Sequence, residues 1–423
     1  MKFLVLPLLA VTMAQAEAVK LSDYRPYSYE VLFTNPTCET YDFKRELFSN
    51  AGNPITSKPD DVYCKASDEA ASVARKSSPQ YRLREWITDA STKELDLAYL
   101  SFKSKAITTA LCEAVKRGVK LRLVLDSGDG EKNASAESLK ECGKEGQVEV
   151  HYRGETGGLG FAHNKIMIVN PRSSAVKIVF SSGNMTTGTS INHENWNFIT
   201  TSGSSYFAQV HSCVLDGMIV AGESKQSFKD FMGNCRSKIS AKPESDITAF
   251  FVPVDGKEAL AKVREAGMNS TLVEGMSHRF SGDLVKLFAQ FLASGKNVRF
   301  LLDDDVYWTA KLKKDIGRNQ RTESFGIYNQ LISKGMDTRF LQTNEQIFQL
   351  QHNKLIVFST DEAPKAVFAG AGNFTSSAFT NNFENFYFIT IPEVVKAFKE
   401  QYKKYFFEMA TKEADMPRDY VHP

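Results

Sequence analysis

One segment of this chain occurs twice. The sequence "ITTALCEAVKRGVKLRLVLD", which starts at Ile107, aligns without a gap with "LVKLFAQFLASGKNVRFLLD", which starts at Leu284. In both copies apolar residues recur with the spacing of a helix packed on one face. Each predicted helix stops at a glycine, Gly118 or Gly295, which suits a left-handed C-terminal cap, and then leads into an apolar strand. This ordered repetition identifies the chain as a duplication.

The duplication extends over most of the sequence. "EVLFTNP" and "ITAFFVP" are predicted to be matching first strands, and each half closes with a predicted helix, within "SSYFAQVHSCVL" and "EVVKAFKEQYKKYFFEMA". Alternating strands and helices predict an α/β fold, with a mixed sheet flanked by helices in each half. The polar stretch 237–246 is the natural seam, so we expect two repeats, at 17–240 and 241–423.

The N-terminus has the pattern of a signal peptide. One charged residue, Lys2, precedes an apolar run from Phe3 to Met13, and Ala14 and Ala16 fit a cleavage site. The run is too short to cross a bilayer as a helix, so a retained membrane anchor is the less favoured alternative. We expect residues 1–16 to be removed and the protein to be secreted or periplasmic.

All the cysteines lie in the first repeat. An even number of cysteines in an exported protein favours disulfides over buried free thiols, and sequential pairing is the simplest arrangement. Their spacing does not suit zinc. The six are Cys38, Cys64, Cys112, Cys142, Cys213 and Cys235.

A short polar motif appears once in each half. "FAHNKIMIV" contains His163 and Lys165, and "LQHNKLIVF" contains His352 and Lys354. Residues two apart along a strand point to the same side, so each His and Lys would present together. Pseudo-twofold packing of the halves would bring both pairs to one site. Other polar residues follow at matched intervals, namely Asn184 with Asn373 and Glu194 with Glu384.

This set of side chains suits a phosphodiester. One imidazole can attack phosphorus, and the opposite imidazole can protonate the leaving oxygen and later deprotonate water. Ammonium and amide groups can hold the non-bridging oxygens as charge shifts. Glu194 and Glu384 are candidates to fix the tautomer of each histidine. This chemistry requires no metal and no cofactor, and the sequence has no evident cluster of metal ligands.

The two motif copies, "HNKIMIVN…SSGNMT" and "HNKLIVFS…GAGNFT", resemble those of the phospholipase D superfamily. The resemblance covers almost the whole mature chain and implies an intramolecular pseudo-dimer with its active site at the interface. It also implies a phosphohistidine intermediate, with His163 as nucleophile and His352 as general acid and base. The orienting carboxylate would come from the opposite half, Glu384 for His163 and Glu194 for His352. The implied phosphate-binding residues are Lys165, Lys354, Asn184 and Asn373.

The match departs from the family pattern at some positions. Asn170 and Ser359 stand where the family has an aspartate seven residues after the histidine. That position points away from His and Lys along the strand, so we expect a structural role for it. Ala371 replaces the expected serine in the second copy, whereas Ser182 in the first copy either aids the phosphate site or is a plain turn residue.

Several other residues have less specific interpretations. His278 ends a strand and could line the cleft, but an ordinary surface or core histidine is the favoured interpretation. Asp126 and Asp303 end matched strands and are expected in solvated turns. "GETGGLGF", before His163, is expected to be a flexible rim of the cleft. The segment that holds Ile347, Phe348 and Leu350 could touch acyl chains, although core packing is favoured.

The charge balance bears on the substrate. Lys plus Arg number 52 against 50 for Asp plus Glu, which argues against a general affinity for nucleic acid but leaves a local basic cleft open. A phospholipid is therefore the favoured substrate, with transient membrane contact and a monomeric state expected; hydrolysis and transfer to an alcohol are not distinguished. The alternatives are a secreted nuclease and a catalytically silent protein that binds phosphate-containing ligands, which Asn170, Ser359 and Ala371 would suit.

Overall fold

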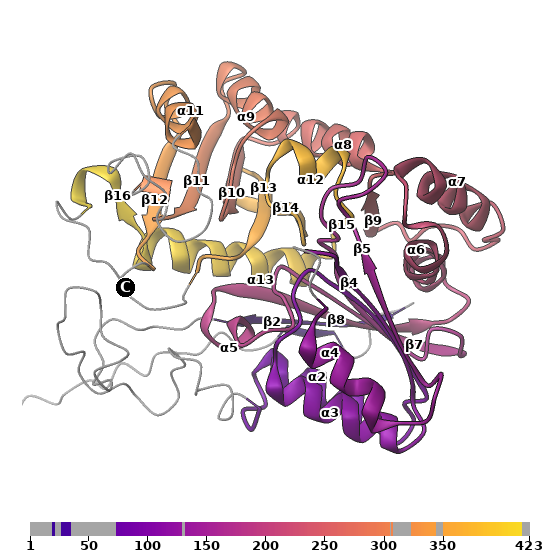
Figure 1. Ribbon diagram of the computed structural model, residues 1–423. Coiled ribbons are helices and arrows are strands. Elements are labelled where there is room, and N and C mark those ends of the chain that lie inside the picture. The colour runs from indigo at the N-terminus through magenta and orange to yellow at the C-terminus, as the bar shows by residue number, and fades with distance from the viewer. Residues whose placement is uncertain are drawn as a thin grey trace, which may run out of the picture.

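The computed structural model describes residues 19–21, 27–34, 73–128, 132–304, 306–307, 323–343 and 350–416. Two eight-stranded sheets form the framework, one from each half of the chain (Figure 1). Both sheets are mixed and carry helices, as the duplicated pattern predicts. The signal peptide expected at 1–16 lies outside the described residues.

The first sheet has the strand order β1-β2-β8-β7-β6-β3-β4-β5. Strands β3, β4 and β5 run parallel, and the other neighbours are antiparallel. The strands are β1 (Val19–Leu21), β2 (Tyr27–Thr34), β3 (Glu94–Tyr99), β4 (Lys120–Asp126), β5 (Val148–Arg153), β6 (Lys165–Val169), β7 (Ala175–Ser181) and β8 (Glu194–Ser202). The helices are α2 (Pro79–Thr88), α3 (Lys105–Lys116), α4 (Ala134–Glu137), α5 (Gly188–Ile191), α6 (Tyr206–Ala221) and α7 (Lys225–Arg236).

The second sheet has the order β16-β12-β11-β10-β13-β14-β15-β9. Read from β9, it repeats the order of the first sheet from β2 onward. The strands are β9 (Ile247–Val252), β10 (Leu272–Ser277), β11 (Asn297–Asp303), β12 (Asp337–Leu341), β13 (Lys354–Thr360), β14 (Ala363–Gly370), β15 (Glu384–Ile389) and β16 (Thr411–Lys412). The helices are α8 (Gly256–Met268), α9 (Asp283–Ala293), α11 (Glu323–Ile332), α12 (Ser376–Thr380) and α13 (Pro392–Lys403), which continues as a π-helix over Lys404–Met409.

The duplicated helices form where the sequence predicts them. Helices α3 and α9 bury one apolar stripe each, and the glycines that follow, Gly118 and Gly295, adopt φ values of 98° and 72°. These left-handed residues end the helices without the steric cost that a side chain would bring. Each helix therefore turns back into the next parallel strand, β4 or β11.

One hydrophobic core joins the two halves. It contains buried side chains of α6 and α13 together with residues from the central strands of both sheets. Across the interface the rings of Phe180 in β7 and Tyr387 in β15 stack with centroids 3.6 Å apart. The Tyr387 hydroxyl also lies 2.9 Å from Nε2 of His211 in α6. Burial of large apolar side chains contributes roughly 1.5–3 kcal/mol each, so this interface holds the halves firmly together.

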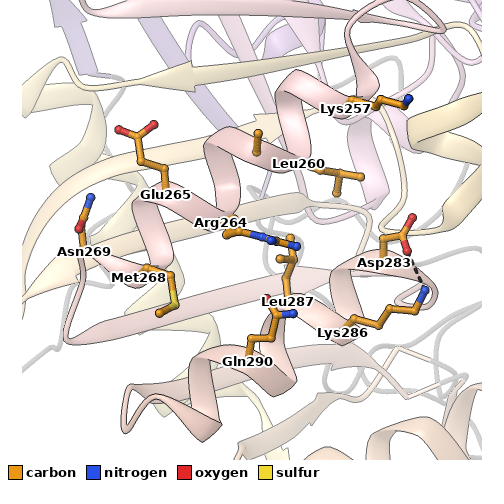
Figure 2. A pocket seen from close by; sticks show the side chains of 11 residues that line it. Lys257, Leu260, Arg264, Glu265, Met268, Asn269, Asp283, Lys286, Leu287 and Gln290 are labelled. Atoms are coloured by element: carbon orange, nitrogen blue, oxygen red, sulfur yellow. Dashed lines mark hydrogen bonds and ion pairs between the residues drawn. The ribbon is translucent and has the colours of Figure 1, made fainter.

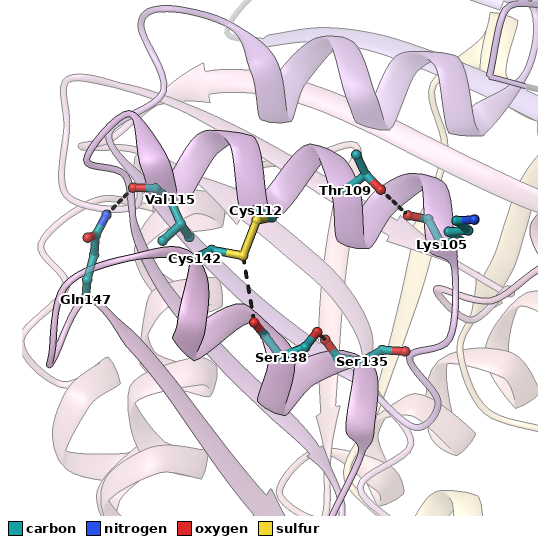
Figure 3. Close-up of a disulfide and its surroundings, with 8 residues drawn as sticks. All are labelled: Lys105, Thr109, Cys112, Val115, Ser135, Ser138, Cys142 and Gln147. Carbon is teal, nitrogen blue, oxygen red and sulfur yellow. Dashed lines mark hydrogen bonds between the residues drawn. A yellow bond between two sulfur atoms is a disulfide. The ribbon is translucent and has the colours of Figure 1, made fainter.

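Two disulfides brace the first half. Cys112 in α3 is bonded to Cys142, at the end of the short helix Ser138–Cys142 (Figure 3), and Cys213 in α6 is bonded to Cys235 in α7. These are two of the three bonds that sequential pairing predicts; Cys38 and Cys64 lie outside the described residues. Disulfides form and persist in oxidising compartments, so these two bonds indicate an oxidising environment for the protein. Within the described part of the chain, no helix combines the length and apolar character that a bilayer crossing requires.

Candidate active site at the interface of the two halves

The two histidine motifs meet where the halves join. Lys165 and Lys354 are the first residues of β6 and β13, so the histidines lie just before the strands and not within them. Each motif is held by the other half through its backbone: the His163 N–H donates to the Phe383 carbonyl at 2.9 Å, and the His352 N–H donates to the His193 carbonyl at 3.0 Å. The pseudo-twofold arrangement therefore places both motifs at the interface.

Each histidine is paired with a carboxylate of the opposite half. Nδ1 of His163 lies 2.8 Å from Oε2 of Glu384, the first residue of β15. Nδ1 of His352 lies 2.9 Å from Oε1 of Glu194, the first residue of β8. A carboxylate at Nδ1 fixes the ring and its tautomer and leaves Nε2 for chemistry. The structure thus has the cross-paired geometry that the family resemblance implies.

The carboxylates are themselves held in place. The Asn382 amide donates to Oε1 of Glu384 at 2.9 Å, and the Asn192 amide lies 3.4 Å from Oε1 of Glu194. The indole N–H of Trp196 donates to Oε2 of Glu194 at 3.1 Å. Sequence reasoning missed the two asparagines, although both halves spell Asn-x-Glu-Asn and the repeat could have revealed them. These supports fix the carboxylates that orient the histidines.

The middle residue of each His-Asn-Lys motif also crosses the interface. The Asn353 Oδ1 accepts a 2.9 Å hydrogen bond from the Asn195 amide. In the matching place Asn385 Oδ1 accepts from the Lys165 backbone N–H at 2.9 Å, and the Asn164 amide lies 3.4 Å away. These buried amide pairs lock the register between the motif strands and the strands that begin with Glu194 and Glu384.

Both motif lysines are fully buried at the centre of the site. The Lys165 ammonium donates to the His163 carbonyl at 3.1 Å and lies 3.3 Å from Nε2 of the same ring. The Lys354 ammonium donates to the carbonyls of His352, at 2.6 Å, and Ser182, at 3.2 Å. Each half thus places a lysine side chain against its own motif histidine residue.

The structure places Ser182 and the two paired asparagines at the ends of β7 and β14. The Ser182 hydroxyl oxygen accepts the Asn195 backbone N–H at 3.0 Å, and Ser182 is completely buried. Ser182 therefore contacts β8 through its hydroxyl and Lys354 through its carbonyl. Asn184 and Asn373 are partly exposed, and their buried Oδ1 atoms have no hydrogen-bond partner among the described residues.

Burial has the largest effect on the pKa values of the histidines, the lysines and Glu194 in the site. It lowers the pKa of both His163 and His352, and the nearby ammonium groups of Lys165 and Lys354 act in the same direction. Burial lowers the pKa of Lys165 to about 8 and that of Lys354 well below its usual range. It also raises the pKa of Glu194 to about 7. Perturbed titratable groups gathered in one place are typical of functional sites.

Two strand-end aspartates have a role beyond the solvated turns expected of them. Asp126 is half-buried and does hold a turn, since its Oδ1 accepts the Gly128 N–H at 2.9 Å. Oδ2 of Asp126 accepts the backbone N–H of Ala162 at 2.6 Å, and Oδ2 of Asp303 accepts that of Gln351 at 2.7 Å. Asp303 is completely buried. Ala162 and Gln351 directly precede the histidines, so each aspartate at the end of β4 or β11 anchors its motif. Because the two aspartates occupy matching positions in the repeat, the sequence could have indicated this shared role.

His278 is a buried histidine, as the favoured interpretation expects, and it also lies beside the second motif. Its ring is buried, and its centroid lies 6.3 Å from that of His352. Asn170 has the structural role expected of it, since its Oδ1 accepts the N–H groups of Lys93 and Glu94 at the start of β3. Ser359 is buried within β13. Ile347 and Phe348 lie outside the described residues, whereas Leu350 is partly exposed.

The glycine-rich segment before His163 is tied down at several points. The Gly160 N–H donates to the Asn381 carbonyl at 2.9 Å, and the Gly157 carbonyl accepts the Lys225 N–H at 3.1 Å. Phe161, at its end, is 47% exposed although it lies only two residues before His163. The segment therefore forms a rim that contacts the second half and presents an aromatic side chain to solvent.

A groove of about 650 Å³ lies elsewhere, on the second half (Figure 2). Its lining residues, among them Arg264, Met268 and Leu287, belong to α8, to the residue after it and to α9. The groove is thus formed by outer helices and not by the motif strands. Among the residues that the structure describes, no three His, Cys, Asp or Glu side chains gather as a metal site.

The sequence matches the model of the family described as cardiolipin synthase, PLD-like domain, at residues 83–213 and 259–406. The two matched segments cover more than half of the chain, one in each half, and each contains a His-Asn-Lys motif. The chain belongs to the phospholipase D superfamily. No curated protein matches the sequence.

One of the similar solved structures supports the same fold. Phosphatidylserine synthase from Haemophilus influenzae aligns with a TM-score of 0.55 at 11% identity, over 78% of this chain and 84% of that chain. Yeast tyrosyl-DNA phosphodiesterase has a TM-score of 0.47 at 10% identity, over 74% and 86%. Polyphosphate kinase from Porphyromonas gingivalis has a TM-score of 0.48 at 13% identity, and the 74% of this chain that aligns spans about half, 46%, of that chain. Only the first likeness is close enough to bear on the fold.

Proposed function

We propose that this protein is a phosphodiesterase of the phospholipase D type that acts on a phospholipid through a phosphohistidine intermediate. The observation that carries the proposal is the pair of cross-bonded histidines, His163 with Glu384 and His352 with Glu194. Two imidazoles with fixed tautomers, each next to a buried ammonium group, match what an in-line displacement at phosphorus requires.

In the first step Nε2 of His163 attacks phosphorus while the bond from phosphorus to the leaving oxygen breaks. His352 donates its proton to that oxygen, so an alcohol departs and a phosphohistidine remains. In the second step His352 takes a proton from water, the water oxygen bonds to phosphorus, and the P–N bond breaks with its electron pair returning to Nε2. An alcohol in place of water would give transfer instead of hydrolysis.

The buried charges suit both steps. A lowered pKa keeps the His163 imidazole neutral and nucleophilic, as the attack requires. The negative phosphodiester, once bound between Lys165 and Lys354, offsets the positive field that opposes protonation of His352. The amides of Asn184 and Asn373 complete the proposed cradle for the non-bridging oxygens, and Ser182 acts by holding Lys354. One preorganised donor of this kind is typically worth about 3 kcal/mol in the transition state.

A phospholipid is the favoured substrate for three reasons. The net charge of +2 does not suit a general nuclease. The matching family model is described as cardiolipin synthase, and the solved structure with a TM-score of 0.55 is a phosphatidylserine synthase. The exposed Phe161 at the rim also offers apolar surface for transient contact with a membrane. We further infer an exported, monomeric enzyme with repeats at 17–240 and 241–423, which the disulfides and the joined core support.

A secreted nuclease with the same chemistry is the second candidate. The protein as a whole is nearly neutral, but the two buried motif lysines give the site a local positive charge. Its activity would fall steeply with salt as phosphate contacts are lost. A silent phosphate-binding protein is a third candidate. The retention of both histidines, both lysines and both carboxylates in bonded geometry favours an enzyme over this alternative.

One assay panel separates these candidates. The purified protein is offered phosphatidylcholine, cardiolipin and single-stranded DNA in the presence of EDTA, with His163→Ala and His352→Ala as controls. We expect cleavage of a phospholipid by the wild type and its loss in both variants. Cleavage of DNA alone would support the nuclease, and turnover that survives both substitutions would overturn the mechanism.

A further inference from the structure

The two sides of the site are not equivalent. In the register of the sheets, Tyr99 of β3 lies opposite Lys165, and Ser277 of β10 lies opposite Lys354. The next residues along the chain, Leu100 and His278, therefore occupy matching positions in the two halves. The pseudo-twofold site thus has a third imidazole on the His352 side, where the His163 side has an aliphatic residue.

His278 lies at the edge of the reactive groups. Its side chain is buried at 9% exposure, and its ring is inclined by 55° to that of His352 with the centroids 6.3 Å apart. This separation lies within the range of direct contact between rings, so His278 borders directly on the His352 imidazole. A buried imidazole at this distance can share a ligand with His352.

The proposed mechanism defines which ligand that is, so this inference rests on the proposed function. Because His163 attacks phosphorus from one side, the leaving oxygen must depart on the opposite side, next to His352. The water or alcohol that completes the reaction must enter at the same place. We propose that His278 is a leaving-group residue, which hydrogen-bonds the departing alcohol oxygen and then the incoming nucleophile.

The charges around His352 explain why a hydrogen-bonding group without a permanent charge suits this position. Lys354 of β13, Lys165 of β6 and the rings of His278 and His163 all lower the pKa of His352, and Glu194 of β8 is bonded to its Nδ1. A further lysine or arginine at this point would oppose protonation of the general acid more strongly. An imidazole can donate to the alcohol oxygen without a permanent charge, while the proton itself comes from His352.

The test compares two leaving groups in the full-length protein. An alkyl diester, taken from the panel above, releases a basic alkoxide that needs a proton and a hydrogen bond. Bis(4-nitrophenyl) phosphate releases nitrophenolate, which needs neither. We expect His278→Ala to lower kcat/KM about fivefold on the alkyl diester, which corresponds to about 1 kcal/mol for one lost hydrogen bond, and less than about twofold on the nitrophenyl diester. His278→Gln, which keeps a donor, should recover part of the loss.

Leu100→Ala is the matched control on the other side of the site, and His151→Ala controls for loss of a histidine that is bonded to Glu149 near the surface. Neither should distinguish the two substrates. Equal losses on both diesters in a folded His278→Ala protein, or no loss at all, would overturn the leaving-group role alone. A wild type that cleaves neither diester would overturn the proposed function as well, so the two failures are distinguishable.

Discussion

Nδ1 of His163 and Oε2 of Glu384 are 2.8 Å apart although 221 residues separate them in the chain. The matching pair, His352 and Glu194, is 2.9 Å apart and separated by 158 residues. Each half therefore supplies one motif imidazole and depends on the other half for the carboxylate bonded to it. Neither repeat contains a complete site, which explains why the interface between the halves is buried and tightly registered.

Removing the charge of Glu384 tests this dependence. We expect Glu384→Gln to lower kcat by roughly 10–100-fold with little change in KM, as is typical when an orienting partner is lost. The His163 ring would keep its place but lose the partner that stabilises it as its charge develops. Steady-state kinetics on the preferred substrate measure the effect. Glu362→Gln is a control, because that carboxylate pairs with Lys399 and Arg299 instead; unchanged kinetics in Glu384→Gln would contradict the role.

Glu194 should make stability depend on pH. Burial raises its pKa from 4.5 to about 7, so the folded protein binds more protons than the unfolded chain between those values. The stability that the neutral carboxyl contributes is present below pH 4.5 and is lost as pH rises through 7, with a total of about 3 kcal/mol. Gln cannot titrate. Melting curves from pH 5 to 8 should therefore show that the melting temperature of Glu194→Gln rises relative to that of the wild type as pH rises. A difference in melting temperature that does not change with pH would refute this.

A substitution at Gly183 tests whether the position of the Glu194 carboxylate matters for catalysis. A Cβ atom built there would lie 1.9 Å from Oε2 of Glu194. Trp196 donates to this oxygen, and His352 is bonded to the other carboxylate oxygen, Oε1. Gly183→Ala should therefore displace the carboxylate and reduce kcat at least about tenfold, as expected for a disturbed orienting group, while the protein still folds. Gly233→Ala in α7, where a Cβ would meet nothing within 4 Å, is the matched control. Full activity in Gly183→Ala would show that the position of Glu194 does not matter.

The Cys112–Cys142 disulfide should affect stability and not catalysis. It closes a loop with a sequence separation of 30, so the double substitution Cys112→Ser with Cys142→Ser should cost about 3–4 kcal/mol of unfolding free energy. Denaturant unfolding measures this loss, and kcat at 25 °C should stay within about twofold of the wild type. A large fall in kcat without a change in the unfolding midpoint would contradict the separation of the two properties.

The sequence predicted those parts of the structure that depend on repetition and local pattern. The sheets and the duplicated helices with Gly118 and Gly295 at their ends follow from periodicity and matched spacing. Two disulfide pairs agree with the sequential pairing assumed for an even number of cysteines. The family resemblance added the cross-pairing of Glu194 and Glu384. Other contacts between distant segments were missed, because the spacing of residues along a chain does not by itself show which side chains become neighbours.

His278 and Asp303 are examples of that limit. The position that matches His278 in the first half holds no histidine, so the repeat did not indicate a functional role for it. Only the fold shows that its ring lies near His352. Asp303 ends a strand, where solvated turns are common, yet it is buried against the backbone before His352. Burial could not be read from its residue type, since charged residues are exposed at most strand ends.

The phosphohistidine is tested most directly by trapping it. In His352→Asn, bis(4-nitrophenyl) phosphate can still react, because nitrophenolate needs no proton, but hydrolysis of the intermediate lacks its base. After rapid mixing, intact-protein and peptide mass spectrometry should find one nitrophenyl phosphate attached to the peptide that contains His163, with none in His163→Asn. No adduct despite release of nitrophenolate, or an adduct on another residue, would contradict His163 as the nucleophile.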